Sequence, residues 1–298
     1  MSEPVYKLRD WIPLDKLNLE IIASEPRAIN VIEQNLHKFD DEWISNPSAL
    51  HLIESKNYPR YMLVELCDNP NPRAIEMIKT YGGLVRQWHL LSANPGALSL
   101  LLENFDKINW NWFSKNPNPD AIPILQQNLH QNVNWYYISE NPNAYPIIKD
   151  NLDKINWNLL CRNKDPRVIK ILEKNPNKIC WEFLSANPAA IHLIKKNINK
   201  INWYGISANP AAIDLIEKNI DKISIENLAS NPAAIHIIKK HIHKYYGNYS
   251  YDFWTNLSFN PEIFILDDQA NTGLRRSLRI KEQNDCELQS ASKKARKA

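Results

Sequence analysis

The apolar and polar positions of the chain repeat with a period of about 22 residues, most regularly between residues 181 and 240. The phrase "NPAAIHLIKKNINKINW" begins at Asn187, and close copies begin at Asn209 and Asn231. Within each copy the apolar residues lie three or four positions apart, which is typical of one face of an α-helix. The pattern therefore predicts a helical protein built from repeated units.

Each copy predicts two short helices with defined ends. Asn187 before Pro188 is the expected N-cap of the first helix, because asparagine accepts hydrogen bonds from free amides and proline at the first position loses none. Asn197 stands where this helix should end, and asparagine tolerates the left-handed conformation found at many helix ends. Asn202 and Trp203 open the second helix. With about ten and about six residues, neither helix would be stable alone in water.

The same phrase recurs along nearly the whole chain. Its opening proline is found at Pro26, Pro47, Pro72, Pro95, Pro119, Pro142, Pro166, Pro188, Pro210, Pro232 and Pro261. One helix pair cannot cover its own apolar face, so we expect successive pairs to stack. The predicted fold class is an all-α solenoid, over residues 1–268, of about eleven two-helix repeats of about 22–24 residues. It should form a curved rod roughly 90–110 Å long, with atypical end repeats as caps.

Residues 269–298 differ in composition and are predicted to form a disordered basic tail. Residues 274–298 contain eight Lys or Arg against three Asp or Glu, a net charge of +5, whereas the rest of the chain has 28 against 30, or −2. The basic residues are Arg275, Arg276, Arg279, Lys281, Lys293, Lys294, Arg296 and Lys297. Such clusters are typical of a nuclear localisation signal or of a patch that binds nucleic acid or another anionic surface. An acidic protein partner is equally compatible.

A tryptophan recurs at the start of the second helix. The series comprises Trp88, Trp110, Trp135, Trp157, Trp181, Trp203 and, after an insertion, Trp254. Exposed, these rings would form a platform for peptides, sugars or bases. Their fixed position, three residues before an apolar partner, favours instead a structural ladder with one buried ring per repeat.

Candidate binding residues are found where the copies differ, because the stacked core does not dictate those positions. In the second helix they include Tyr136, Tyr137, Glu182, Tyr204 and Glu226; a charged row on the first helix, such as Lys195 and Lys196, is the alternative. The insertion "KYYGNYSYDFW" adds Tyr245, Tyr246, Tyr249 and Tyr251. Tyrosine is enriched at interface hot spots, although the insertion would also suit a loop packed on the last repeat. Solenoids bind partners along extended faces.

No catalytic, metal or cofactor site is predicted. The sequence lacks phosphate-binding glycine loops, H-E-x-x-H and G-x-S-x-G, and it has only six glycines. His236, His241 and His243 lie near one another, but no cysteine or carboxylate completes a zinc set. Four scattered cysteines and the lack of a long apolar run indicate an intracellular protein without a membrane span.

The units resemble the short Asn-Pro-x-Ala-Ile helical repeat proteins of large nucleocytoplasmic DNA viruses, of the mimivirus and algal virus type. "LSANPAAIHLIKKNINKINW" (184–203) carries the resemblance best, and related units cover about residues 16–266. The resemblance implies a viral protein of the host cytoplasm or nucleus, or of the virion, and it brings no catalytic residues.

We therefore expect a non-enzymatic scaffold, with no small-molecule substrate, that binds other proteins, whether host, viral or capsid proteins, through an extended solenoid surface. One alternative is a minor capsid or internal virion protein that bridges larger components. Another is a nucleic-acid-associated protein held by its basic tail.

Overall fold

The computed structural model describes residues 4–55, 60–81, 87–245 and 251–272. The described chain is mostly helical, which confirms the predicted all-α class. One short element was not predicted: the strands β1 (Tyr6–Leu8) and β2 (Phe264–Leu266) form an antiparallel ribbon that joins the two ends of the described chain.

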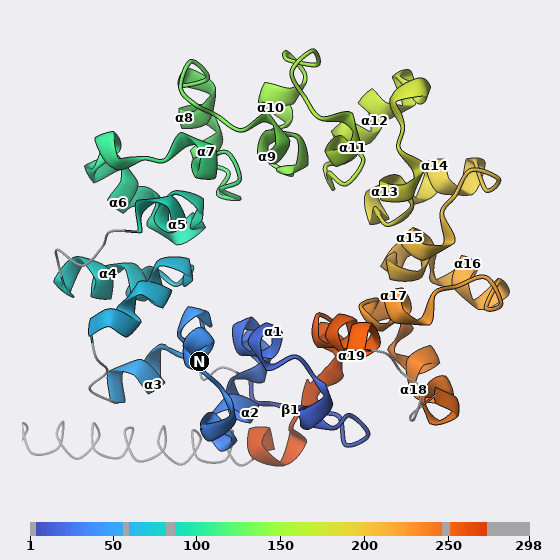
Figure 1. Ribbon diagram of the computed structural model, residues 1–298, viewed down its shortest axis with the longest axis horizontal. Helices are drawn as coiled ribbons and strands as arrows, with labels where there is room; N and C mark the ends of the chain where they lie inside the picture. The colour runs from blue at the N-terminus through green and yellow to red at the C-terminus, as the bar shows by residue number, and fades with distance from the viewer. Residues whose placement is uncertain (1–3, 56–59, 82–86, 246–250, 273–298) are drawn as a thin grey trace, which may run out of the picture.

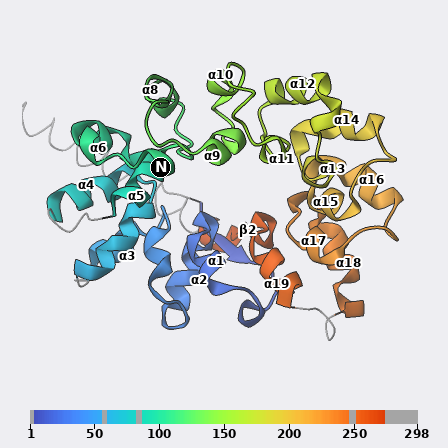
Figure 2. The ribbon, with the colours of Figure 1, turned by 45° about the horizontal axis from the view of Figure 1, so that its top comes forward.

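Helices alternate between an inner and an outer row, and the rows are arranged in a ring (Figures 1 and 2). The inner row comprises α1 (Leu19–Ser24), η4 (Asp41–Ser45), η5 (Arg60–Asp68), α5 (Trp88–Ala93), α7 (Trp110–Phe113), α9 (Trp135–Glu140), α11 (Trp157–Leu160), α13 (Trp181–Ser185), α15 (Trp203–Ala208), α17 (Ile225–Ala229) and α19 (Tyr251–Ser258). The outer row comprises α2 (Ile29–Gln34), α3 (Leu50–Ser55), α4 (Pro72–Tyr81), α6 (Leu98–Glu103), α8 (Ala121–Gln127), α10 (Tyr145–Ile148), α12 (Pro166–Lys174), α14 (Ile191–Lys196), α16 (Ile213–Lys218) and α18 (Ile235–Tyr245).

Short 3₁₀ turns connect the rows, and several of them form the first turn of an outer helix. They are η1 (Leu14–Lys16), η2 (Pro26–Ala28), η3 (Leu36–Lys38), η6 (Pro95–Ala97), η7 (Phe105–Lys107), η8 (Pro176–Lys178), η9 (Pro188–Ala190), η10 (Pro210–Ala212), η11 (Pro232–Ala234) and η12 (Pro261–Ile263). The asparagine caps act as expected: Asn187 Oδ1 accepts a hydrogen bond from the Ala189 amide, and Asn202 Oδ1 accepts one from the Gly205 amide.

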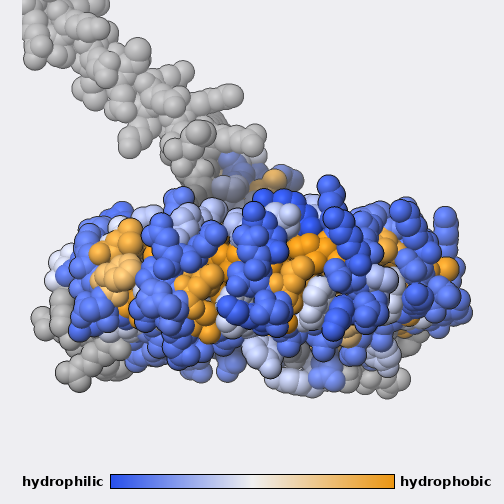
Figure 3. All heavy atoms as spheres, turned by 90° about the horizontal axis from the view of Figure 1, so that it is seen from above, coloured by the Kyte–Doolittle hydropathy of each residue, from blue (hydrophilic) through white to orange (hydrophobic). Residues whose placement is uncertain are grey.

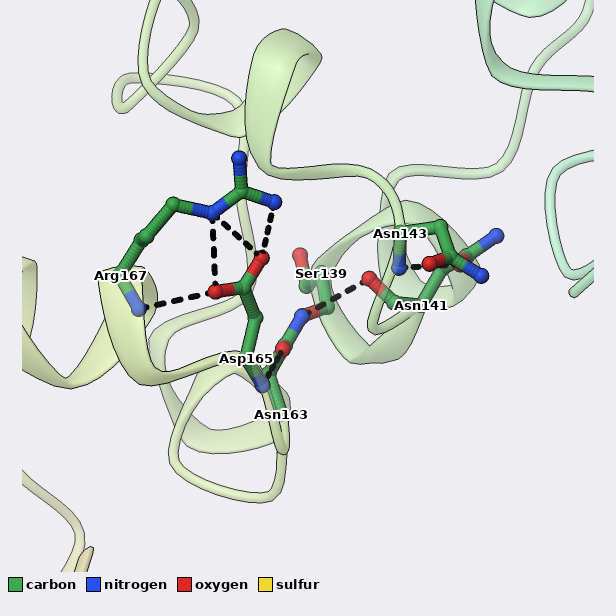
Figure 4. A network of polar contacts seen from close by, with 6 residues as sticks. All are labelled: Ser139, Asn141, Asn143, Asn163, Asp165 and Arg167. Carbon is green, nitrogen blue, oxygen red and sulfur yellow. Dashed lines mark hydrogen bonds and ion pairs between the residues drawn. The ribbon is translucent and has the colours of Figure 1, made fainter. Parts of the chain in front are cut away.

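The capping asparagines also join successive repeats. Asn163 Nδ2 donates to the carbonyl oxygens of Ser139 (3.0 Å) and Asn141 (2.9 Å), while Asn163 Oδ1 accepts from the Asp165 amide (Figure 4). The same arrangement is found at Asn46, Asn69, Asn94, Asn116, Asn141, Asn187, Asn209, Asn231 and Asn260, all of them buried. From Asn69 onwards, each side-chain amide bonds to the backbone carbonyl of the ladder asparagine one repeat earlier, and Asn46 bonds in the same way to the Glu25 carbonyl. These side chains therefore form an asparagine ladder around the ring.

A serine forms a second repeated junction. Ser185 Oγ donates to the Trp181 carbonyl oxygen (2.6 Å) and accepts from the Asn202 amide of the next repeat (2.9 Å). Cys161 Sγ takes the acceptor role towards the Cys180 amide, at 3.3 Å. The N-cap of each such inner helix is thus tied to the inner helix before it.

The expectation of an open rod with capped ends is wrong, because the two ends meet. α1 packs against α19, and the Asn18 amide donates to Ser258 Oγ (2.8 Å), as at the other junctions. The meeting point, which we call the seam, is reinforced by the β1–β2 ribbon. The end repeats keep apolar faces that need cover: Ile22 and Leu257 are fully buried.

The ladder changes at the seam. Glu25 occupies the asparagine position, and its carboxylate caps the Arg27 amide but has no proton to donate to the preceding repeat. Arg27 replaces the missing donor, with Nη1 3.0 Å from the Pro261 carbonyl oxygen and 3.2 Å from Glu262 Oε1.

The ordered structure continues past the predicted domain boundary at 268. Residues 268–272 are helical, and Asn271 exchanges two hydrogen bonds with the Val5 backbone.

One sequence expectation about helix ends is wrong. Asn197 has φ −127° and ψ 43°, which is not left-handed, and Asn219 is similar. The side-chain Nδ2 of Asn197 instead donates to the backbone carbonyl oxygen of Leu193, four residues earlier, at 2.9 Å. The asparagine is therefore favoured at this position because its side chain satisfies a free carbonyl of the last turn.

Candidate protein-binding face

We call the exposed and half-exposed side chains of the inner helices the inner face, and two arcs of it differ in character. In the aromatic arc, from α7 to α15, the residue after the repeated tryptophan, or the next one, is often aromatic: Trp112, Tyr136, Tyr137, Phe183 and Tyr204. These positions lie across the helix from the buried residues, which leaves Tyr136 61% exposed and Tyr204 67% exposed.

Cations lie over several rings of the aromatic arc. Lys115 Nζ lies 4.1 Å from the centre of the Trp112 ring and 5.8 Å from that of Tyr137, and the Arg162 guanidinium lies 5.7 Å from Phe183. The arc thus already holds ammonium and guanidinium groups against aromatic faces, an attraction worth about 0.5–1 kcal/mol when exposed.

The acidic arc consists of α17, α19, α1, η4 and η5, and it crosses the seam. These helices carry the carboxylates of Glu226, Asp252, Glu20, Asp41, Glu42, Glu65 and Asp68 against a single basic residue, Arg60. Among the residues that the structure describes, none of these seven carboxylates forms an ion pair.

The pKa values at one end of the acidic arc reflect burial and nearby charges. Burial raises the pKa of Glu65, and the negative charge of Asp68 and of two carboxylates on η4 raises it further. Burial also raises the pKa of Asp68, where Lys115 and His89 act in the opposite direction. The carboxylates of η4 and η5 are therefore close enough to repel one another.

Three hollows follow the inner helices, and the connections that lead into them, across the seam. The first, of about 490 Å³, and the second, of about 380 Å³, share Tyr204 and Glu226. The third, of about 290 Å³, shares Thr255 with the second and continues to Glu20 and Glu42. Together they form what we call the seam groove, which runs from α15 to η4.

The predicted binding residues occupy different parts of the ring. Tyr136, Tyr204 and Glu182 are exposed on inner helices, while Tyr137 and Glu226 are half-buried on inner helices. Tyr251, at the start of α19, is 75% exposed and lines the seam groove. The other predictions lie outside the described residues: Tyr246, Tyr249, the side chain of Tyr245, and the basic tail residues Arg275, Arg276, Arg279, Lys281, Lys293, Lys294, Arg296 and Lys297.

The tryptophan series is less buried than a fully enclosed ladder would be. Trp254 is buried, whereas the other members are half-buried and pack against the core: Trp88, Trp110, Trp135, Trp157, Trp181 and Trp203. A lysine from the following repeat covers three of these rings. The ammonium groups of Lys154, Lys200 and Lys222 lie 5.2, 5.7 and 5.3 Å from the centres of Trp135, Trp181 and Trp203.

Two features of the ring were missed from the sequence, although each has a signal there. The junction serine follows the tryptophan by four residues, as in Trp181 and Ser185, and the covering lysine opens the recurrent "KIN" or "KIS" that leads into the next inner helix. The seam groove has no such signal, because Glu20 and Asp252 belong to opposite ends of the sequence.

The outer rim, seen edge-on, has apolar strips between hydrophilic ridges (Figure 3). His192 and His236 each bond to a glutamate of the preceding outer helix, Glu173 at 2.9 Å and Glu217 at 3.0 Å.

Within the described residues no group of three or more His, Cys, Asp or Glu side chains could hold a metal ion. No helix of the described chain is long and apolar enough to cross a membrane.

Comparison with protein-family models, with curated proteins and with solved structures gives no match to this chain. The resemblance to repeat proteins of large DNA viruses therefore rests on the sequence motifs alone.

Proposed function

We propose that this chain is a non-enzymatic scaffold, a closed α-solenoid that binds another protein on its inner face. The observation that carries the proposal is a set of exposed tyrosines on three inner helices, Tyr136 on α9, Tyr204 on α15 and Tyr251 on α19. Tyr204 shares a hollow with Glu226 and Asp252, and neither carboxylate forms an ion pair within the described part of the chain. Tyrosine supplies large contact area at low conformational cost, so it is favoured in protein interfaces.

The repeat architecture supports this proposal, because it would hold the inner face in one shape before a partner arrives. Each asparagine of the ladder fixes three hydrogen bonds in a buried position, and Ser258 continues the serine junction across the seam. A preorganised surface loses less conformational freedom on binding, which leaves more of the contact energy as affinity.

The charge of the inner face bears on the alternative of a nucleic-acid partner. Phosphates would be repelled by the acidic arc, since nucleic-acid binding depends on neutralising them with Lys and Arg. Nucleic acid would have to bind elsewhere, for example through residues 275–297. A protein partner is therefore the function that the described surface favours.

Affinity capture with matched variants tests the proposal. A double variant, Tyr136→Ala with Tyr204→Ala, should lose the partner that the wild-type chain captures from cells expressing it. A control with Leu102→Ala and Ile198→Ala removes outer side chains of similar exposure, 49% and 48%, and should keep that partner. Equal capture by both variants would show that the inner face is not the binding surface.

A further inference from the structure

The seam groove joins two ends of the chain that the sequence keeps apart. Tyr204 and Glu226 come from α15 and α17, and Tyr251 and Thr255 come from α19. The rest of the wall comes from α18, from the connection that leads into α17, from α1 and η4, and from the residues that lead into α1 and η4. Neighbouring helices pack about 8–10 Å apart, so five inner helices span about 40 Å. An extended polypeptide covers about 3.3 Å per residue and would fill this length with about 12 residues.

The groove walls are predominantly acidic. Six carboxylates line the three hollows: Glu20, Asp40, Glu42, Asp221, Glu226 and Asp252. Three lysines also line them, and one of these, Lys222, has its ammonium over the Trp203 ring. Apart from a hydrogen bond that Ser224 Oγ donates to Glu226, these carboxylates have no side-chain hydrogen-bond or ion-pair partner among the described residues.

A second feature of the groove also indicates a missing contact. Thr255 Oγ1, between the second and third hollows, is buried and has no hydrogen-bond partner within the described part of the chain. Buried polar atoms are rarely left without a partner in folded proteins. Exposed rings lie on both sides of this hydroxyl, Tyr204 towards α15 and Tyr251 towards α1.

We propose that the seam groove binds an extended, Lys- and Arg-rich segment of a partner protein. Carboxylates on successive helices would pair with the cationic side chains, and Tyr204 and Tyr251 would offer faces for cation–π contact. The Thr255 hydroxyl would bond to the backbone of the segment. This inference rests on the proposed protein-binding function, and it adds the place and the chemistry of the partner.

Fluorescence anisotropy with defined peptides tests the groove in the full-length chain. The probes are labelled peptides of about 12 residues, alternating Arg with Gly or Glu with Gly. The Arg peptide should bind the wild-type chain, and its affinity should fall as salt screens the charges. The Glu peptide should not bind.

Two matched variants separate the groove from general charge effects. One replaces groove carboxylates: Glu20→Gln, Glu42→Gln, Glu226→Gln and Asp252→Asn. The control replaces the same number of exposed carboxylates far from it: Asp106→Asn, Asp120→Asn, Asp150→Asn and Asp153→Asn. The groove variant should weaken binding of the Arg peptide about tenfold or more, whereas the control should change it by about twofold or less. Circular dichroism checks that both variants keep their helical content.

Several outcomes would overturn the inference. It fails if the Arg peptide does not bind, if both variants weaken binding equally, or if the Glu peptide binds as well. It also fails if the Arg peptide binds only after Lys293, Lys294, Arg296 and Lys297 are replaced by Gln, because the chain's own tail would then be the occupant. Self-association that is lost in the groove variant would instead identify a second copy. The proposed scaffold function is tested separately, by capture of a partner from cells. If the groove variant still captures that partner and the Tyr136/Tyr204 variant does not, the scaffold function is supported and the groove is not its binding site.

Discussion

Replacing Asn209 with Ala should remove one step of the asparagine ladder. The Asn209 side chain is fully buried, and its Nδ2 donates to the carbonyl oxygens of Ser185 (2.9 Å) and Asn187 (3.1 Å). Its Oδ1 caps the Ala211 amide at 3.0 Å. The substitution deletes all three hydrogen bonds and leaves a small void at a repeat junction.

The loss of stability depends on which hydrogen bonds the former partners of Asn209 keep. The Asn187 carbonyl oxygen keeps a hydrogen bond from the Ala190 amide, whereas no other bond is described for that of Ser185. A buried group without a partner costs about 1–3 kcal/mol, and loss of an N-cap costs about 0.5–2 kcal/mol. We therefore expect Asn209→Ala to lower the free energy of unfolding by about 2–4 kcal/mol.

Urea denaturation followed by far-ultraviolet circular dichroism measures this change. Asn219→Ala is the matched control, because Asn219 is half-buried and its Nδ2 donates only to the Leu215 carbonyl oxygen, at 2.9 Å. Its Oδ1 accepts one further, exposed hydrogen bond, from Lys222 Nζ. The control should cost about 1 kcal/mol or less. Asn209→Asp keeps the cap acceptor but removes both donors, so it should be at least as destabilising as the alanine variant. The reasoning is refuted if Asn209→Ala and Asn219→Ala unfold within about 0.5 kcal/mol of each other, or if Asn209→Asp is as stable as the wild type.

Three further results are expected. Arg27→Ala should accelerate amide exchange across the β1–β2 ribbon about fivefold, because it removes about 1 kcal/mol of contacts at the seam. The thiols of Cys67 and Cys161 should resist iodoacetamide in the folded chain, because burial raises their pKa to about 12 and about 11, and both should react once urea unfolds the chain. Lys200→Gln should cost about 0.5–1 kcal/mol in urea denaturation, since the ammonium over the Trp181 ring is lost.

Each of these results has its own control. Arg73→Ala removes an arginine paired with Glu54 on the outer surface, and it should leave exchange in the ribbon unchanged. Rapid alkylation of the buried thiols without urea would contradict their raised pKa, because only the thiolate is nucleophilic. For the cation–π contact, Lys196→Gln on the outer face should change stability by less than Lys200→Gln; an equal loss would mean that general charge is responsible.

The sequence was sufficient for the local structure, because the signals that start each helix are themselves local. Asn187 before Pro188, and Asn202 before Trp203, cap helices as predicted. The pattern also placed Tyr136 and Tyr204 on an exposed row, since they lie opposite the apolar residues of the same helix. The sequence did not reveal that the capping asparagines also bond to the preceding repeat, because the carbonyls that they bind are more than 20 residues away. Asn209, for example, donates to the Ser185 carbonyl oxygen.

The closed ring and the seam groove were decided by the tertiary structure alone. Each repeat turns slightly relative to the last, and whether these small rotations bring the ends together depends on packing along the whole chain. Closure sets Glu20 of the first repeat beside Tyr251 and Thr255 of the last, in one wall of the groove. The sequence determined which residues could stand on the inner face. Only the completed ring determined that carboxylates from both ends would stand there together, because their proximity is set by long-range geometry that no local pattern encodes.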